Sequence, residues 1–237
     1  MNKKITQADV SIRAVVVLSG GQDSATSLAL ACRKFGPSRV AAITFTYGQR
    51  HAVEVQYARH LAEEVFKIAT WMQVSLGFYE SITENALMNH DQKITRAKGA
   101  KCPNTVVEGR NALFLQIASV WAKRLGATEI YTGVSEADFS GYPDCREAFI
   151  KAQQRSIRLA LDYPIKIVTP FMHMSKTDEW ALADELGILD LIKNETVTCY
   201  NGIPGAGCGH CPACRLRNRG LRAYERQKKA LSKRSKR

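Results

Sequence analysis

Two adjacent glycines, a carboxylate and two hydroxyls follow an apolar, β-branched run near the start of the chain. The run is RAVVVL (13–18), and SGGQDS (19–24) comes directly after it. A buried strand that turns sharply into a helix gathers free backbone N–H groups and the positive end of the helix dipole at one point, where phosphate binds. We therefore predict a phosphate-binding loop with its first helical turns. Its residues are Leu18, Ser19, Gly20, Gly21, Gln22, Asp23, Ser24, Ala25, Thr26, Ser27 and Leu28.

SGGQDS does not match two common phosphate-binding loops. GxxxxGK[ST] requires a lysine that is absent here, and GxGxxG requires glycines at another spacing. SGGQDS instead resembles the PP-loop, SGGxDS, of ATP pyrophosphatases. The resemblance implies that ATP is split into AMP and pyrophosphate while a carboxyl, carbonyl or amide oxygen is adenylated. Because a carboxylate repels phosphate, Asp23 is expected to act on Mg²⁺ or on the N–H groups of the loop.

Four of the seven cysteines crowd into one short segment with the spacing C-x8-C-x2-C-x2-C. They are Cys199, Cys208, Cys211 and Cys214. A Cys-x2-Cys turn brings two thiolates to one ion, so the segment predicts one closed, structural Zn²⁺ site. Three alternatives stay open: an iron–sulfur cluster, since the last three cysteines match part of a ferredoxin pattern, His210 in place of one thiolate, and free thiols.

Positive charge is concentrated at the end of the chain. The net charge is +12, and residues 215–237 hold eleven Lys or Arg with a single Glu. The sequence predicts a solubilising helix with a frayed end, and an RNA-binding or anion-binding tail is the alternative. Because residues 222–237 contain few apolar side chains, we expect them not to shape a pocket.

Strand-like and helix-like segments alternate along the chain. Strands are predicted at 13–18, 40–47, 70–74, 129–134 and 165–168, and helices at 24–35, 51–66, 111–125, 146–161 and 176–186. Residues 78–108 are polar and irregular and predict a long functional loop. The alternation predicts an α/β fold with a mostly parallel sheet and helices on both faces, which binds ligands beyond the carboxyl ends of its strands.

Several further stretches occur in one order and together resemble a known family. They are FTYGQRH (45–51), EGRNALFL (108–115), GVSEADFSGYPDCREAFI (133–150), TPFMHMSKTDEW (169–180) and TCYNGIPGAGCGHCPACRLRNRG (198–220). With LSGGQDS they resemble the 7-cyano-7-deazaguanine synthases of queuosine biosynthesis, whose fold is the adenine nucleotide alpha hydrolase-like PP-loop fold. The resemblance implies conversion of 7-carboxy-7-deazaguanine, ammonia and ATP into the nitrile. Glu108 departs from the proline of the family pattern PGRN.

The resemblance and the chemistry of the side chains together give candidate site residues. Asp23, Ser24, Arg110 and Lys176 are expected to act on the phosphates and the metal. A second group is expected at the purine-like base: Asp138 as acceptor, Phe139 and Tyr142 as stacking rings, and Asp144 and Arg146 as alternative polar contacts. Each member of the second group has an ordinary alternative as a loop-capping acid or core aromatic. Cys145 is interpreted as a packed thiol.

Domains, cofactors and partners follow from these features. Residues 1–195 are expected to form the nucleotide-binding domain, 196–220 the zinc segment and 221–237 a basic tail. The expected cofactors are one Zn²⁺ and Mg²⁺, with ATP, ammonia and a deazapurine acid as substrates. No apolar run is long enough to span a bilayer and no signal peptide is evident, so we expect a cytoplasmic protein without a membrane partner or an obligatory nucleic acid; a homodimer is compatible. Two rival functions remain: a tRNA-modifying PP-loop enzyme (a thiolase or a lysidine-type synthetase), and a zinc-ribbon nucleic-acid-binding protein.

Overall fold

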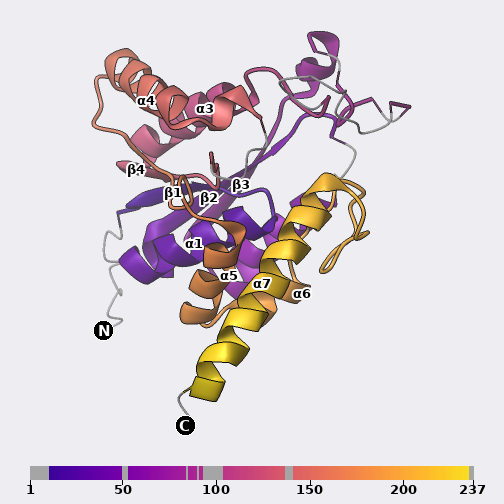
Figure 1. Cartoon of the computed structure of the whole chain (residues 1–237). Helices are drawn as coiled ribbons and strands as arrows, with labels where there is room; N and C mark the ends of the chain where they lie inside the picture. The colour runs from indigo at the N-terminus through magenta and orange to yellow at the C-terminus, as the bar shows by residue number, and fades with distance from the viewer. Residues whose placement is uncertain are drawn as a thin grey trace, which may run out of the picture.

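A five-stranded parallel sheet forms the centre of the molecule (Figure 1). The computed structural model describes residues 11–49, 53–83, 85–89, 91–92, 104–136 and 141–234. The strand order is β3-β2-β1-β4-β5. The strands are β1 Ala14–Val17, β2 Val40–Thr46, β3 Thr70–Ser75, β4 Glu129–Tyr131 and β5 Lys166–Val168. Every neighbouring pair is parallel, so the predicted α/β fold with a parallel sheet is confirmed.

The central strands are short runs of apolar residues because helices cover both of their faces. Ala14 in β1 lies opposite Val40 in β2 on one side and Glu129 in β4 on the other. The predicted strand over 129–134 was too long: β4 ends at Tyr131. Beyond that point residues 132–135 line a cavity instead of continuing the strand ladder.

Helices form one layer on each face of the sheet (Figure 1). On one face lie α3 Arg110–Leu125 and α4 Glu147–Leu161. The other face carries α1 Gln22–Phe35, α2 Glu54–His60 with a π-helical turn Leu61–Val65, α5 Lys176–Glu185, α6 Leu189–Asn194 and α7 Pro212–Arg234. Within the described ranges, no helix combines the length and apolar character needed to cross a membrane.

Helix α7 is better anchored than the predicted solubilising tail. It runs without interruption from Pro212 to Arg234, so the predicted boundary after residue 220 lies inside it. Tyr224 is buried and its hydroxyl hydrogen-bonds the Asp184 carboxylate of α5. A few apolar residues are enough to anchor α7, because only one narrow face of the helix packs along α5. The last turns of α7 extend beyond the body of the molecule (Figure 1).

Candidate active site

The SGGQDS loop lies at the carboxyl end of β1, where the chain connections lead to opposite sides of the sheet. Gly20 has φ +86°, and a Cβ there would lie 2.4 Å from the carbonyl oxygen of Glu54, so only glycine fits. The Ser24 hydroxyl accepts the Ser19 N–H at 3.2 Å and lies 3.1 Å from the Gly21 carbonyl oxygen, to which it donates. The loop is therefore closed by one of its own side chains.

The loop is also fixed from a segment far along the chain. The Val197 N–H donates to the Gly20 carbonyl oxygen at 2.9 Å, and the Gln22 N–H donates to Thr198 Oγ1 at 3.2 Å. Sequence reasoning missed both partners, because they precede Cys199 in a stretch that indicated only a metal site. The residues just before the cysteine cluster thus set the shape of the phosphate loop.

A cavity of about 600 Å³ opens in front of the loop. This volume falls within the usual range for small-molecule sites. The predicted site residues that line it are Leu18, Ser19, Gly21, Gln22, Asp23, Ser24, Arg110, Tyr142 and Lys176. The structure therefore brings the predicted phosphate residues together with Tyr142 around one space.

Other predicted residues lie behind the cavity wall. Gly20, Ala25, Thr26, Ser27 and Leu28 are buried and are not among the lining residues. The Ala25 N–H already donates to the Gly21 carbonyl oxygen at 3.0 Å, so it is engaged within the helix. Gly20 therefore belongs to the inner side of the loop, and the other four residues support the loop from within α1.

The predicted base-contacting residues divide into three groups. Tyr142 lines the cavity, whereas Asp144 and Arg146 do not. Asp144 accepts the Asn111 N–H at 3.0 Å and so satisfies the start of α3, and Arg146 is exposed at the start of α4. Asp138 and Phe139 lie outside the described residues.

Lys176 joins two carboxylates beside the loop. Its Nζ donates to Asp23 Oδ2 at 2.8 Å and to the two Glu179 oxygens at 3.0 and 2.9 Å. Lys176 and Glu179 are 8% and 1% exposed, so water has little access to the contact between them. Asp23 Oδ1 is buried without a hydrogen-bond partner in the described structure. Sequence reasoning missed Glu179, although it lies three residues after Lys176 on the same helix face.

Burial, and then the negative charge of Asp23, raise the pKa of the Glu179 carboxyl. The single ammonium of Lys176 lowers that pKa but does not offset both effects, because two carboxylates share it. In the folded protein Glu179 therefore holds its proton at pH values where the unfolded chain, with a glutamate pKa of about 4.3, has lost it. This difference destabilises the fold progressively as the pH rises above that value.

We expect Glu179→Gln to stabilise the protein at neutral and alkaline pH. Glutamine resembles the protonated acid and carries no pH-dependent penalty. The gain in unfolding free energy should be near zero at about pH 4 and grow by at most about 1.4 kcal/mol per pH unit. Urea unfolding at pH 4.5, 6 and 8 measures it. Glu147→Gln is the control with opposite sign, because Lys151 lowers the pKa of Glu147. A Glu179→Gln gain that shrinks with rising pH would contradict the assignment.

Arg110 is the second cation of the cavity. Its guanidinium donates to the Tyr47 hydroxyl at 3.0 Å and lies 5.7 Å from the centre of that ring. The turn before it is well supported at the position that departs from the family pattern. The Tyr79 hydroxyl donates to the Glu108 carbonyl oxygen at 2.9 Å, and Thr83 Oγ1 hydrogen-bonds the Glu108 carboxylate. Glutamate at position 108 is therefore compatible with this turn, because both its backbone and its side chain are hydrogen-bonded.

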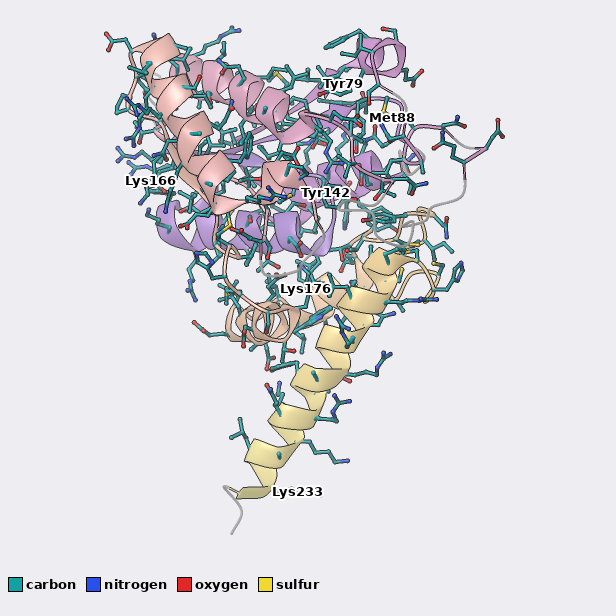
Figure 2. The ribbon with its side chains drawn as sticks, turned by 45° about the horizontal axis from the view of Figure 1, so that its top comes forward. Tyr79, Met88, Tyr142, Lys166, Lys176 and Lys233 are labelled. Carbon is teal, nitrogen blue, oxygen red and sulfur yellow. The ribbon has the colours of Figure 1, made fainter. Side chains whose placement is uncertain are left out.

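Aromatic side chains supply flat surfaces in the cavity wall. Phe45 and Phe114 stack with their ring centres 4.1 Å apart and their planes 9° from parallel. The Tyr142 hydroxyl lies 2.6 Å from Thr105 Oγ1 and 3.5 Å from the Tyr200 hydroxyl. Tyr142 and Lys176 lie toward the middle of the molecule, whereas Lys233 marks the far end of α7 (Figure 2). The cavity thus combines cations near the loop with aromatic walls.

Cys145 also lines the cavity. Burial is the main reason that the pKa of its thiol is raised, to about 12. At neutral pH the group is a protonated thiol and a weak nucleophile. Its Sγ lies 3.5 Å from Asn111 Nδ2, which donates to it. These properties match the interpretation of Cys145 as a packed thiol.

The four clustered cysteines converge on one point. Their sulfur atoms all lie within 4.8 Å of one another. Backbone N–H groups donate to three of the sulfurs at 3.3–3.4 Å, as expected for thiolates held ready for a metal. Gly207 has φ +69°, and a Cβ there would lie 2.3 Å from Cys214 Sγ. His210 is exposed, lies outside the sulfur cluster, and hydrogen-bonds the Cys208 carbonyl oxygen through Nδ1 at 2.9 Å. The donor set therefore fits a four-thiolate metal site.

The cysteine segment forms one wall of the cavity. Tyr200, Pro212, Ala213, Leu216 and Arg217 all line it. Arg217 is 2% exposed, its guanidinium lies 5.0 Å from the Trp180 ring centre, and it donates to the Ile192 carbonyl oxygen at 2.7 Å. Sequence reasoning missed Arg217 because its context is a run of surface cations. The metal site and the cavity are thus parts of one structure.

The chain matches one known protein family over most of its length. Residues 13–225 match the family described as queuosine biosynthesis protein QueC. The chain belongs to this family. The matched region covers every described strand and extends into α7 as far as the turn that carries Tyr224. The family resemblance inferred from the motifs is therefore confirmed.

Solved structures that resemble the chain have low sequence identity to it. NMN synthetase from Francisella tularensis is 17% identical with a TM-score of 0.48, over 77% of this chain and 64% of that one. A 4-thiouridine synthetase–RNA complex with bound ATP is 21% identical with a TM-score of 0.48, over 91% and 50%. The NH3-dependent NAD synthetase from Campylobacter jejuni is 13% identical with a TM-score of 0.44, over 80% and 69%. The chain thus spans about two thirds and one half of the first two proteins.

Proposed function

We propose that the protein converts 7-carboxy-7-deazaguanine, ammonia and ATP into 7-cyano-7-deazaguanine. The observation that carries the proposal is the SGGQDS loop, which faces a cavity with Lys176 and Arg110 in a member of a queuosine-biosynthesis family. An ATP-dependent enzyme of that pathway fits both the family and the site. The nitrile-forming reaction is the specific step proposed here.

The chemistry requires two activations of the same carbon. A carboxylate resists attack because its leaving group would be oxide. Adenylation by a first ATP releases pyrophosphate and makes AMP the leaving group, and ammonia then displaces AMP to give the amide. Adenylation of the amide oxygen by a second ATP, followed by loss of AMP and a proton from nitrogen, gives the nitrile. Each product therefore requires two ATP and yields two AMP and two pyrophosphates.

Residues of the cavity suit the charge that develops on phosphate. The backbone of residues 18–24 and the Ser19 and Ser24 hydroxyls supply hydrogen-bond donors, and Lys176 and Arg110 supply positive charge. The buried, unpartnered Oδ1 of Asp23 fits a ligand for Mg²⁺. Bound there, Mg²⁺ would neutralise part of the phosphate charge.

The remaining parts have supporting roles in the proposal. Tyr142, with Asp138 and Phe139 from the adjoining segment, is proposed to hold the deazapurine ring. Zn²⁺ on the four cysteines is proposed as structural, since four thiolates leave no open coordination position. Its role would be to hold the cavity wall that includes Arg217.

Incubation of the protein with ATP, Mg²⁺, ammonium and 7-carboxy-7-deazaguanine tests the reaction. Mass spectrometry should detect the nitrile with two AMP per molecule formed. Without ammonium, only exchange of labelled pyrophosphate into ATP is expected, because adenylation is reversible and nothing traps the adenylate. Product formation without RNA separates this reaction from a tRNA-modifying PP-loop activity. If the amide accumulated and no nitrile formed, the activity would be limited to converting the carboxylate into the amide.

A further inference from the structure

One face of α7 carries a regular line of exposed cations. It consists of Arg215, Arg219, Arg222, Arg226, Lys229 and Lys233, all exposed. We call these six residues the α7 stripe. Their spacings alternate between four and three residues, the pattern that keeps side chains on one face of a helix. With 100° per residue the six fall within an arc of about 80°.

The α7 stripe lies almost opposite the side of α7 that packs on the body. The buried positions are Cys214, Arg217, Gly220 and Tyr224, and they point about 150° away from the stripe. At 1.5 Å per residue the stripe is about 27 Å long. It begins beside the cysteine cluster and follows α7 beyond the body of the molecule (Figure 1).

Several charged residues of α7 that lie outside the stripe have partners on the body of the molecule. Lys228 pairs with Asp184, Glu225 pairs with Lys193 at 2.9 Å, and Arg217 is buried against Trp180. Within the described part of the chain, none of the six stripe residues forms an ion pair with a carboxylate. The charged residues of α7 that face the body therefore have partners there, whereas the α7 stripe faces outward without neutralising carboxylates among the described residues.

We propose that the α7 stripe binds the phosphodiester backbone of a nucleic-acid duplex without reading its bases. Six cations in line match a linear array of negative charge, and about 27 Å is most of one duplex turn of 34–36 Å. Four of the six are arginines, whose planar guanidinium groups donate two parallel hydrogen bonds to phosphate. The chemistry is shared by RNA and DNA, because only phosphate is contacted.

Two other polyanions fit the stripe less well. A helix that lies on an anionic membrane needs an apolar face that enters the lipid, but the stripe contains no apolar residue and the apolar side of α7 is turned to α5. An acidic protein would have to present carboxylates along the same straight line. A duplex carries about one phosphate charge per 1.7 Å of its axis, so negative charge faces the stripe along its whole length. The proposed binding is independent of the reaction at the cavity, whose substrates are small molecules.

The salt dependence of binding tests the proposal. Fluorescence anisotropy of labelled 20-base-pair RNA and DNA duplexes is titrated with the full chain between 50 and 200 mM salt. For six phosphate contacts, log K against log salt should have a slope of about −5.4, so that affinity falls roughly 1,800-fold over this range. Vesicles of phosphatidylserine and polyglutamate are the competing probes.

Two variants of equal charge separate the stripe from general electrostatics. The stripe variant combines Arg219→Gln, Arg222→Gln, Arg226→Gln and Lys229→Gln. The control variant combines Arg39→Gln, Arg124→Gln, Arg155→Gln and Lys166→Gln, which are exposed positions away from α7; Lys166 lies far from α7 (Figure 2). Glutamine keeps helix propensity, and circular dichroism checks folding.

The stripe variant should reduce the slope to about −1.5 to −2, and the control variant should keep the wild-type slope. A third variant that combines Arg219→Lys, Arg222→Lys and Arg226→Lys should also keep it, because charge is retained. Equal losses in the stripe and control variants would overturn the proposal. So would tighter binding to vesicles or polyglutamate than to the duplexes. None of the variants touches the cavity, so turnover of the small substrates serves as a separate readout.

Discussion

Asp23→Asn should lower the turnover number for AMP formation by about 10²- to 10³-fold, the usual cost of losing one preorganised electrostatic contact at a reacting group. The substitution keeps the shape of the side chain but removes its charge. Lys176 then loses the negative charge of its partner at 2.8 Å, and Oδ1 loses the negative charge that favours a metal ion. Release of AMP at saturating ATP and ammonium measures the effect, with circular dichroism as the check on folding.

Asp178→Asn is the matched control for Asp23→Asn. It makes the same charge change only two residues from Lys176, but Asp178 belongs to the capping box of α5 with Ser175. Loss of such a cap costs about 0.5–2 kcal/mol of stability, and asparagine can still accept the hydrogen bond. Turnover by Asp178→Asn should therefore stay near the wild-type value. Similar losses in both variants would show that Asp23 acts through local charge alone.

Cys211→Ser should release the metal and loosen the whole segment from residue 197 to residue 217. Structural Zn²⁺ sites bind with about 10 kcal/mol or more, which is comparable with the stability of an entire domain. Because Val197 and Thr198 bond to Gly20 and Gln22, the phosphate loop should loosen as well and ATP affinity should fall. Hydrogen exchange followed by mass spectrometry, with metal analysis of the same samples, measures these effects.

His210→Ala is the matched control for Cys211→Ser. His210 lies one residue away from the same cysteine but is exposed and outside the sulfur cluster. It should keep one equivalent of zinc and wild-type exchange rates. Loss of metal in this variant would replace the four-cysteine assignment with three cysteines and a histidine. A brown protein that absorbs near 400 nm would instead identify an iron–sulfur cluster.

The sequence predicted the sheet well because its signals are local. The apolar runs at 13–18 and 40–47 could hardly form anything but buried strands, and each helix that was predicted is present in the described structure. Long helix α7 was harder. It starts inside a cysteine motif, contains Gly220, and buries only a narrow set of side chains against α5. Its propensity and patterning are those of a solvated tail, and only packing shows otherwise.

The active site was predicted where chemistry and local motif coincide. Asp23, Arg110 and Lys176 were found this way and do line the cavity. Arg217 and Thr198 were missed, because their proximity to the loop depends on how a distant segment folds back. Asp144 had two predicted roles, a contact to the base and a loop-capping acid, and its carboxylate accepts the Asn111 N–H at the start of α3. Sequence type alone does not distinguish a ligand contact from a helix support.

The bonds between Gly20 and Val197 and between Gln22 and Thr198 also determine when the site can form during synthesis. β1 and the loop leave the ribosome early, but the segment that completes them follows after most of the chain has been made. Contacts of such large sequence separation form late, because a long loop must first close. A nascent chain therefore completes its sheet strands before it acquires a finished nucleotide site. A chain that terminates before the cysteine segment contains the sequences of all five strands but lacks Val197 and Thr198, which fix the phosphate loop.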